Sequence, residues 1–243
     1  MLASRVSSIG TNPLNSISVI IPARNAERYL GEAIASIQGQ THTVDEIIVI
    51  DNGSKDGTAS LARKLGATVE SEPFPGASFA RNKGISMARG EFLAFLDADD
   101  LWLPHKLEWQ MEAFRTHRDL EAAFGLLEQF ISPEIPPEDA ARIHCPIEAT
   151  PARLPSLMLI KKIAFERIGF FSPEWKRAEA VEWMVRAIGM GLRHVTVPHV
   201  VTRRRLHDSN MGITLRAFNK EYIRIIRSKM LRDRRDVGSS STH

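Results

Sequence analysis

Three acids that follow a short apolar run near the middle of the chain are the residues best placed to do chemistry. The run is Phe92 to Leu96, and the acids are Asp97, Asp99 and Asp100. An apolar run of this length between polar residues predicts a buried strand. Carboxylates crowded at the end of a strand repel one another unless a cation, usually a hard divalent ion, lies among them. The alternative is an acidic structural turn in which Asp100 caps a helix that begins at Leu101.

Two further apolar runs are predicted to be strands that end in polar residues. They are Ser18 to Pro22 (SVIIP) and Ile47 to Ile50 (IIVI), and Asp51 follows the second run. The intervening segment Glu27 to Gln38 carries apolar residues at helical spacing. Alternating strands and helices predict parallel crossovers, which bring the three strand ends to one edge of a sheet and predict a nucleotide site there. The remaining predicted elements are helices at 58–65 and 78–88, strands at 67–70, 120–124, 156–160 and 195–201, and a proline-rich loop at 131–155.

These segments resemble glycosyltransferase family 2, whose members have the GT-A nucleotide-diphospho-sugar transferase fold. The matching stretches are SVIIPARNAERYL, EIIVIDNGSKDGT and GASFARNKGISMARGEFLAFLDADD, with a weaker match over 169–210. The resemblance implies a single α/β domain at 17–212, with a Rossmann-like, mostly parallel central sheet flanked by helices. Its nucleotide-binding half would be 17–104 and its acceptor half 105–212. The implied activity is that of a hexosyltransferase that uses a nucleotide-diphospho-sugar, which we expect to be UDP-linked, and the sequence leaves the acceptor open.

The resemblance also assigns substrate-binding roles. The loop from Pro22 to Glu27 would pack around the nucleoside base, and Asp51 and Asn52 would reach it. Many relatives have an acid where Asn52 stands, and Asn still offers a base both a donor and an acceptor. For Arg81, the alternative to a substrate contact is an ion pair with the acidic edge. The predicted substrate-binding residues are Pro22, Ala23, Asn25, Glu27, Asp51, Asn52, Arg81, Asp97, Ala98, Trp183 and Arg205.

A metal site is the next implication. By resemblance, Asp97 would face the ribose and the metal, Asp99 would bind the metal, and His207 would contact the metal or the phosphates. Arg205 belongs to a run of three arginines suited to phosphate. We expect Mn²⁺ or Mg²⁺, because a divalent ion stabilises the charge that develops on a diphosphate leaving group. A lone histidine is otherwise a hydrogen-bonded loop residue.

The segment EAVEWMVR at 179–186 matches the place where the family keeps its catalytic acid. The usual pattern is a Glu-Asp pair at a helix start, and the Asp removes a proton from the acceptor hydroxyl during an inverting displacement. Here Ala180 occupies the Asp position. Glu179 and Glu182 lie on one helix face, and either is a candidate base. The alternative is that both acids are structural, in a non-catalytic nucleotide-sugar-binding or partner protein.

Composition agrees with a single domain in a reducing compartment. The chain has 243 residues and one cysteine, Cys145, so it forms no disulfide within itself. We expect a cytoplasmic protein, because no apolar run reaches membrane-spanning length and residues 1–16, a predicted mobile arm, lack a signal-peptide core. A nucleotidyltransferase is the least favoured alternative, since the glycine-rich loop expected after the first strand is absent.

The C-terminal segment 213–236 is predicted to be a basic amphipathic helix, followed by a disordered tail at 237–243. The net positive charge of this segment is larger than the net charge of +3 of the whole chain. Such a helix packs on the core with a solvated basic face, or contacts the inner membrane face peripherally, a homodimer partner or an anionic acceptor. Nucleic acid is not an expected partner, because no aromatic residues interleave with the charges in the pattern of a nucleic-acid-binding patch.

Overall fold

The computed structural model describes residues 15–175 and 178–207. Residues 1–14 of the arm predicted at 1–16, the helix predicted at 213–236 and the tail predicted at 237–243 lie outside the described residues. Of the helices in the described residues, none is long and apolar enough to cross a membrane.

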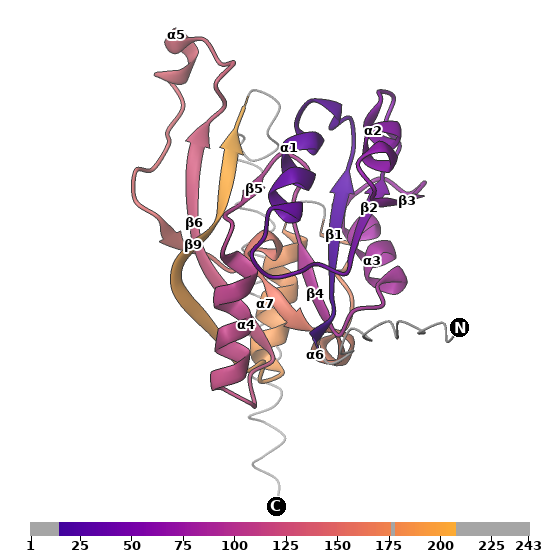
Figure 1. Ribbon diagram of the computed structural model, residues 1–243, viewed down its shortest axis with the longest axis vertical. Coiled ribbons are helices and arrows are strands. Elements are labelled where there is room, and N and C mark those ends of the chain that lie inside the picture. The colour runs from indigo at the N-terminus through magenta and orange to yellow at the C-terminus, as the bar shows by residue number, and fades with distance from the viewer. Residues whose placement is uncertain (1–14, 176–177, 208–243) are drawn as a thin grey trace, which may run out of the picture.

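The N-terminal half alternates strands and helices, as the apolar pattern predicts. Its four strands pair in parallel in the order β3-β2-β1-β4. The predicted helix at 27–38 is confirmed, and the other predicted elements of this half shift by only one or two residues. Figure 1 shows this half with β1 at its centre. The strands are β1 (Ile17–Ala23), β2 (Glu46–Asp51), β3 (Thr68–Ser71) and β4 (Phe92–Phe95), and the helices are α1 (Glu27–Gln38), α2 (Thr58–Lys64) and α3 (Ala77–Met87).

The C-terminal half extends the same sheet in the order β4-β8-β6-β9-β5, with β7 paired to β6. Strands β6 and β9 are long, parallel and curved, and Figure 1 shows them running beyond the rest of the sheet toward α5. The strands are β5 (Leu101–Trp102), β6 (Ala122–Ile131), β7 (Thr150–Pro151), β8 (Leu159–Lys161) and β9 (His194–Leu206). The helices are α4 (Lys106–Thr116), α5 (Pro137–Ala140), α6 (Lys162–Ile168), α7 (Glu179–Gly189) and a 3-10 turn, η2 (Pro155–Leu157).

Three expectations for this half are corrected by the structure. Leu101 begins β5 and not a helix, so Asp100 is no helix cap, and α4 begins only at Lys106. The strand predicted at 195–201 extends to Leu206, and the register between β6 and β9 shifts in a bulge beside Pro198. The predicted loop at 131–155 contains the short elements α5 and β7.

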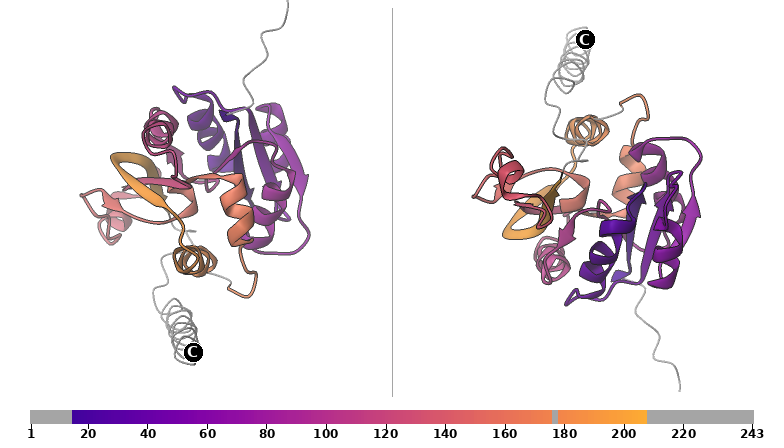
Figure 2. Two further views of the ribbon diagram at one scale, coloured as in Figure 1. Left: turned by 90° about the horizontal axis from the view of Figure 1, so that it is seen from below. Right: turned by 90° about the horizontal axis from the view of Figure 1, so that it is seen from above.

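Apolar side chains cover both faces of the sheet, and helices pack on each face (Figure 2). Successive residues of a strand point to opposite faces, so Ile20 joins one core cluster while Val19 and Ile21 join the other. The first cluster includes Phe165 of α6 and Trp183 of α7, and the second includes residues of α1. Because both faces of these strands are buried, polar groups gather at their carboxyl ends.

Candidate active site

The carboxyl ends of β1, β2 and β4 meet at one edge of the sheet, as predicted. Ala23 lies opposite Asp51 in the parallel register, and the backbone N–H of Asn52 donates to the carbonyl of Ala23 over 2.8 Å. Strand β4 pairs with the other side of β1, where Phe95 lies opposite Ile20. The ends of β1, β2 and β4, which are far apart in the sequence, therefore lie side by side at this edge of the sheet.

The loops after β1 and β2 are tied to each other by side chains predicted to bind substrate. The side-chain oxygen of Asn25 accepts a hydrogen bond from the N–H of Lys55 over 2.8 Å, and a carboxylate oxygen of Glu27 accepts one from Gly57 over 2.8 Å. Asn25 has a φ of 50°, a left-handed conformation that Asn tolerates better than most residues. Asn25 and Glu27 thus shape the loop between Pro22 and α1, and their contact with a base stays a prediction.

Asn52 has a structural task that its sequence position does not reveal. Its amide nitrogen donates to the carbonyls of Glu72 (2.9 Å) and Phe74 (2.7 Å), and its oxygen accepts from the N–H of Gly76 (2.7 Å). A carboxylate could not donate the first two bonds, so Asn52 is suited to hold the loop before α3. The carboxylate of Asp51 accepts a hydrogen bond from the N–H of Ser54 over 3.1 Å, and Asp51 is only partly buried.

Arg81 of α3 joins two carboxylates from distant elements. Its Nη2 lies 2.7 Å from Oδ1 of Asp97 and its Nη1 lies 2.8 Å from Oε1 of Glu179. Burial lowers the pKa of the Arg81 guanidinium, but the two neighbouring carboxylates outweigh burial and raise that pKa overall. The ion pair with the acidic edge, one of the two alternatives for Arg81, is therefore the contact that the structure contains.

Asp99 and Asp100 occupy the turn after β4. Oδ2 of Asp99 lies 3.0 Å from Nε2 of His207, whose ring packs 4.7 Å from the ring of Tyr29. Asp100 is buried, and its Oδ1 accepts the backbone N–H of Arg205 over 3.0 Å. Burial, and then the charges of Asp99 and Asp97, raise the pKa of the Asp100 carboxyl well above its usual value. Burial is the larger of these causes, so the shift mainly reflects the loss of solvent around Asp100.

Two side chains at this turn are of types that can bind a divalent metal ion. Asp99 and His207 supply an oxygen and an imidazole nitrogen on neighbouring chain segments, while the Oδ1 atom of Asp97 is held by Arg81. Within residues 15–175 and 178–207, no group of three His, Cys, Asp or Glu side chains is arranged around a common metal position. A metal held here would therefore take further oxygen ligands from a bound diphosphate or water, as Mg²⁺ commonly does.

Comparison with known proteins identifies the family. The model of the family described as glycosyl transferase family 2 matches residues 18–131. An uncharacterized glycosyltransferase of Rickettsia typhi is 30% identical over 224 residues, which cover 85% of this chain and 69% of the relative. The chain belongs to glycosyltransferase family 2.

Two further similarities concern a shorter stretch and the fold. An uncharacterized glycosyltransferase of Nostoc is 42% identical over 106 residues, which are 41% of this chain but only 33% of the relative's length. Glucosyl-3-phosphoglycerate synthase from Mycobacterium tuberculosis, in complex with Mn²⁺, UDP and phosphoglyceric acid, superposes with a TM-score of 0.63 at 22% identity. That match covers 88% of this chain and 78% of the synthase. The predicted GT-A fold is thereby confirmed.

The two candidate bases of this family-2 protein lie in different surroundings. Both carboxylate oxygens of Glu182 contact Arg186, each over 3.1 Å, and Arg186 also donates to the carbonyls of Ile168 and Phe170. Glu182 therefore belongs to a network that fixes the chain after α6. Glu179 instead reaches the acid edge, through Arg81 and Asp97. The structure thus separates two acids that the sequence left equivalent.

Trp183, predicted to bind substrate, lies in the core. Its indole stacks on the ring of Phe165 with 4.8 Å between ring centroids, and its Nε1 donates to the carbonyl of Gly169 over 2.7 Å. Only 2% of the residue is exposed, so Trp183 stabilises the packing of α7 on α6. A contact between Trp183 and substrate stays a prediction.

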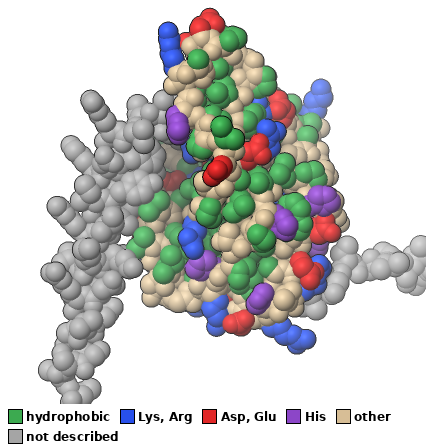
Figure 3. Space-filling view, turned by 90° about the vertical axis from the view of Figure 1, so that its left-hand side faces the viewer, with side chains coloured by type: hydrophobic (Ala, Val, Ile, Leu, Met, Phe, Trp, Pro, Cys, Tyr) green, Lys and Arg blue, Asp and Glu red, His purple; other side chains and the backbone are tan. Residues whose placement is uncertain are grey.

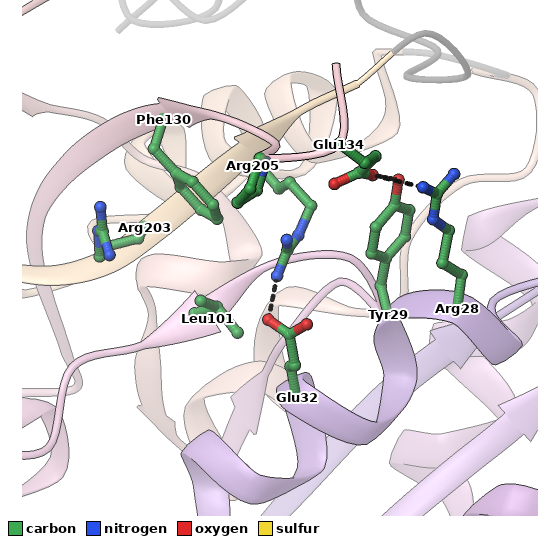
Figure 4. Close-up of a pocket in the computed structure, with 9 residues that line it drawn as sticks. Arg28, Tyr29, Glu32, Leu101, Phe130, Glu134, Arg203 and Arg205 are labelled. Atoms are coloured by element: carbon green, nitrogen blue, oxygen red, sulfur yellow. Dashed lines mark hydrogen bonds and ion pairs between the residues drawn. The ribbon is translucent and has the colours of Figure 1, made fainter. Parts of the chain in front are cut away.

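Arg205 connects the acid turn to α1. Its Nη2 lies 2.6 Å from Oε2 of Glu32, and its Nε donates to the backbone carbonyl of Asp99 over 3.0 Å. The guanidinium lies between the rings of Tyr29 and Phe130, at 4.8 and 4.9 Å from their centroids (Figure 4). Sequence reasoning missed Tyr29 and Glu32, because no local pattern links α1 to a residue 173 positions later. The predicted phosphate contact of Arg205 stays a prediction.

Proposed function

We propose that this protein transfers a sugar from a UDP-sugar to a hydroxyl group of an acceptor, with inversion at the anomeric carbon and with Mn²⁺ or Mg²⁺ bound. The observation that carries the proposal is the meeting of Asp97, Asp99, His207 and Glu179 at the carboxyl edge of the sheet, beside Asp51. This edge is where α/β folds place their ligands.

The expectation of a UDP-linked donor and a divalent ion is supported by what similar proteins bind. Glucosyl-3-phosphoglycerate synthase was crystallised with UDP together with Mn²⁺ or Mg²⁺. A divalent ion, when bound, would supply Lewis-acid stabilisation of the charge on the diphosphate leaving group. Asp99 and His207 would hold the ion, and Asp51 would contact the nucleoside. Arg81 would hold Asp97 in place through the contact between its Nη2 and Oδ1 of Asp97.

Glu179 is the proposed general base, in place of the Asp that Ala180 replaces. A base must lie within reach of the acceptor hydroxyl near the donor's anomeric carbon. Glu179 is tied to the acid edge through Arg81, whereas both oxygens of Glu182 are engaged by Arg186. Glu179 would take the proton of the acceptor hydroxyl as that oxygen bonds to the anomeric carbon and the diphosphate leaves. We also propose that the reaction takes place in the cytoplasm, where Cys145 stays reduced.

A second function is favoured by one specific observation. Ala180 cannot accept a proton, so the chain would bind nucleotide sugars without transferring them if Glu179 does not replace the missing Asp. Both functions require metal-dependent binding of UDP, and only the first requires turnover.

Two measurements test these functions. Calorimetry with UDP is expected to show binding in Mn²⁺ that weakens in EDTA. Release of UDP from UDP-glucose, UDP-galactose and UDP-N-acetylglucosamine, with water as the acceptor, is expected for at least one donor. Binding without release of UDP would support the non-catalytic function, and absence of metal-dependent UDP binding would refute both functions.

A further inference from the structure

A cavity of about 710 Å³ opens between α1, β5 and the far ends of β6 and β9 (Figure 4). Its volume falls within the ~300–1,000 Å³ typical of small-molecule sites. The cavity is bounded by residues that the proposed mechanism leaves without a task, chiefly Arg28, Glu32, Phe130, Glu134 and Arg203.

We propose that this cavity binds the sugar portion of an uncharged, hydroxyl-rich acceptor. The proposal rests on the proposed transferase function and names the acceptor class that this function leaves open. Three features of the cavity support it: its position beside the acid turn, the pairing of its charges and the aromatic ring in its wall.

The cavity shares a wall with the candidate active site. Tyr29 lines the cavity, and its ring lies 4.7 Å from the ring of His207, whose Nε2 is 3.0 Å from Asp99. Arg205 also lines the cavity and contacts the backbone carbonyl of Asp99. One layer of side chains therefore separates a ligand in the cavity from the predicted metal ligands. An acceptor held in the cavity could extend a hydroxyl around this layer toward the donor.

Each cation of the cavity wall has a carboxylate partner. Arg205 pairs with Glu32, Arg28 with Glu134, and Arg203 with Glu128. On the side of the molecule that carries β6 and β9, charged side chains of both signs are interspersed with hydrophobic ones (Figure 3). A phosphate or carboxylate that approached one of these arginines would also meet its carboxylate partner and be repelled by it, so the wall does not favour an anion.

The same pairs suit a ligand rich in hydroxyl groups. The side chains of Arg28 and Glu32 are each 60% exposed, so they are accessible to a ligand while they keep their partners. Guanidinium groups donate hydrogen bonds and carboxylates accept them, which matches hydroxyls that do both. Charge-assisted hydrogen bonds of this kind are stronger than neutral ones.

Phe130 adds an apolar aromatic ring to the cavity wall. The guanidinium carbons of Arg203 and Arg205 lie 4.6 and 4.9 Å from the centroid of its ring, and these contacts fix the ring's orientation. Leu101 and Pro133 are further apolar residues of the wall. Alternating apolar and polar groups match a sugar ring, which presents C–H groups on its faces and hydroxyls around its rim.

Saturation-transfer NMR on the full chain, with UDP and the diamagnetic ion Mg²⁺, tests the proposal. The probes are the methyl β-glycosides of glucose, galactose and N-acetylglucosamine, with inorganic phosphate as the anionic comparison. At least one glycoside is expected to receive saturation, and Phe130→Ala is expected to weaken its binding roughly 3- to 10-fold, the range for loss of an aromatic contact. Phe130→Trp should retain binding, since it keeps a flat ring.

Phe170→Ala is the matched control, because Phe170 is a 47%-exposed phenylalanine that is absent from the cavity wall. Arg28→Ala, at an exposed position where unfolding is not expected, should also weaken glycoside binding and serves if Phe130→Ala does not fold. No glycoside binding, binding that neither variant weakens, or phosphate binding that Arg203→Met abolishes would overturn the proposal. Calorimetry with UDP on the same samples separates the two proposals: intact UDP binding without glycoside binding refutes the cavity assignment alone. Glycoside binding without UDP binding refutes the proposed function alone.

Discussion

Replacement of Glu179 by Gln, with Glu182→Gln as its matched control, tests the assignment of the base. The two acids lie on the same helix, are similarly buried, and each contacts an arginine. Gln keeps the shape of Glu and can still accept a hydrogen bond, but it is a far weaker proton acceptor. Both variants lose one charge-assisted contact, so each is expected to lose about 1.5–3 kcal/mol of unfolding free energy.

The two variants should differ in turnover. General-base catalysis contributes roughly 10²–10⁴-fold, which corresponds to about 2.7–5.4 kcal/mol of activation free energy. Glu179→Gln should therefore lower the rate of UDP release by this factor, while its affinity for UDP with Mn²⁺ changes little. Glu182→Gln should lower the rate much less, because its carboxylate orients Arg186 and the chain at 168–170.

A coupled assay of UDP release, run beside thermal unfolding of both variants, distinguishes a loss of base from a loss of structure. Equal rates in both variants, or a larger loss in Glu182→Gln, would refute the assignment of Glu179. Ala180→Asp is the complementary variant: faster UDP release than in the wild type is expected if the family's missing acid limits the rate.

Three other predictions address the metal site, a loop and a buried amine. Asp99→Asn should lower UDP affinity in Mn²⁺ to the value measured in EDTA, since a charged ligand is lost, and unchanged metal dependence in calorimetry would count against Asp99. Asn52→Asp should cost about 1–3 kcal/mol in denaturant unfolding, because a carboxylate cannot donate to the carbonyls of Glu72 and Phe74; equal stability would show that the loop does not depend on Asn52. Burial lowers the pKa of the Lys106 amine well below its usual value. The unfolded chain binds a proton on this amine below a pH of about 10.4, and the folded protein binds that proton less readily. Stability relative to Lys106→Met should therefore fall as the pH is lowered from about 10 to 8, by at most ~1.4 kcal/mol per unit, and a pH-independent difference between the two proteins would contradict this reasoning.

Local patterns in the sequence were sufficient to predict the strands and helices of the N-terminal half. Each apolar run, from Ser18, Ile47 and Phe92 onward, became a buried strand, and the segment at 27–38 became α1. Burial of an apolar face depends on residues only a few positions apart, so periodicity reports it directly. Parallel crossovers then oblige the strand ends to share one edge, which is why the meeting of Asp51 and Asp97 could be predicted before any contact was known.

Only the tertiary structure decided which partner each polar side chain contacts. The pairing of Glu179 with Arg81 spans 98 residues, and that of Arg205 with Glu32 spans 173. Glu179 and Glu182 share a helix face and a chemistry, so the sequence could not separate them; their different arginine partners do. The side chain of Asn52 likewise forms hydrogen bonds with a loop about 20 residues away in the sequence. A buried charge or amide is stable only where a complementary group meets it, and distant strands and helices bring that group into place only when the whole sheet has assembled.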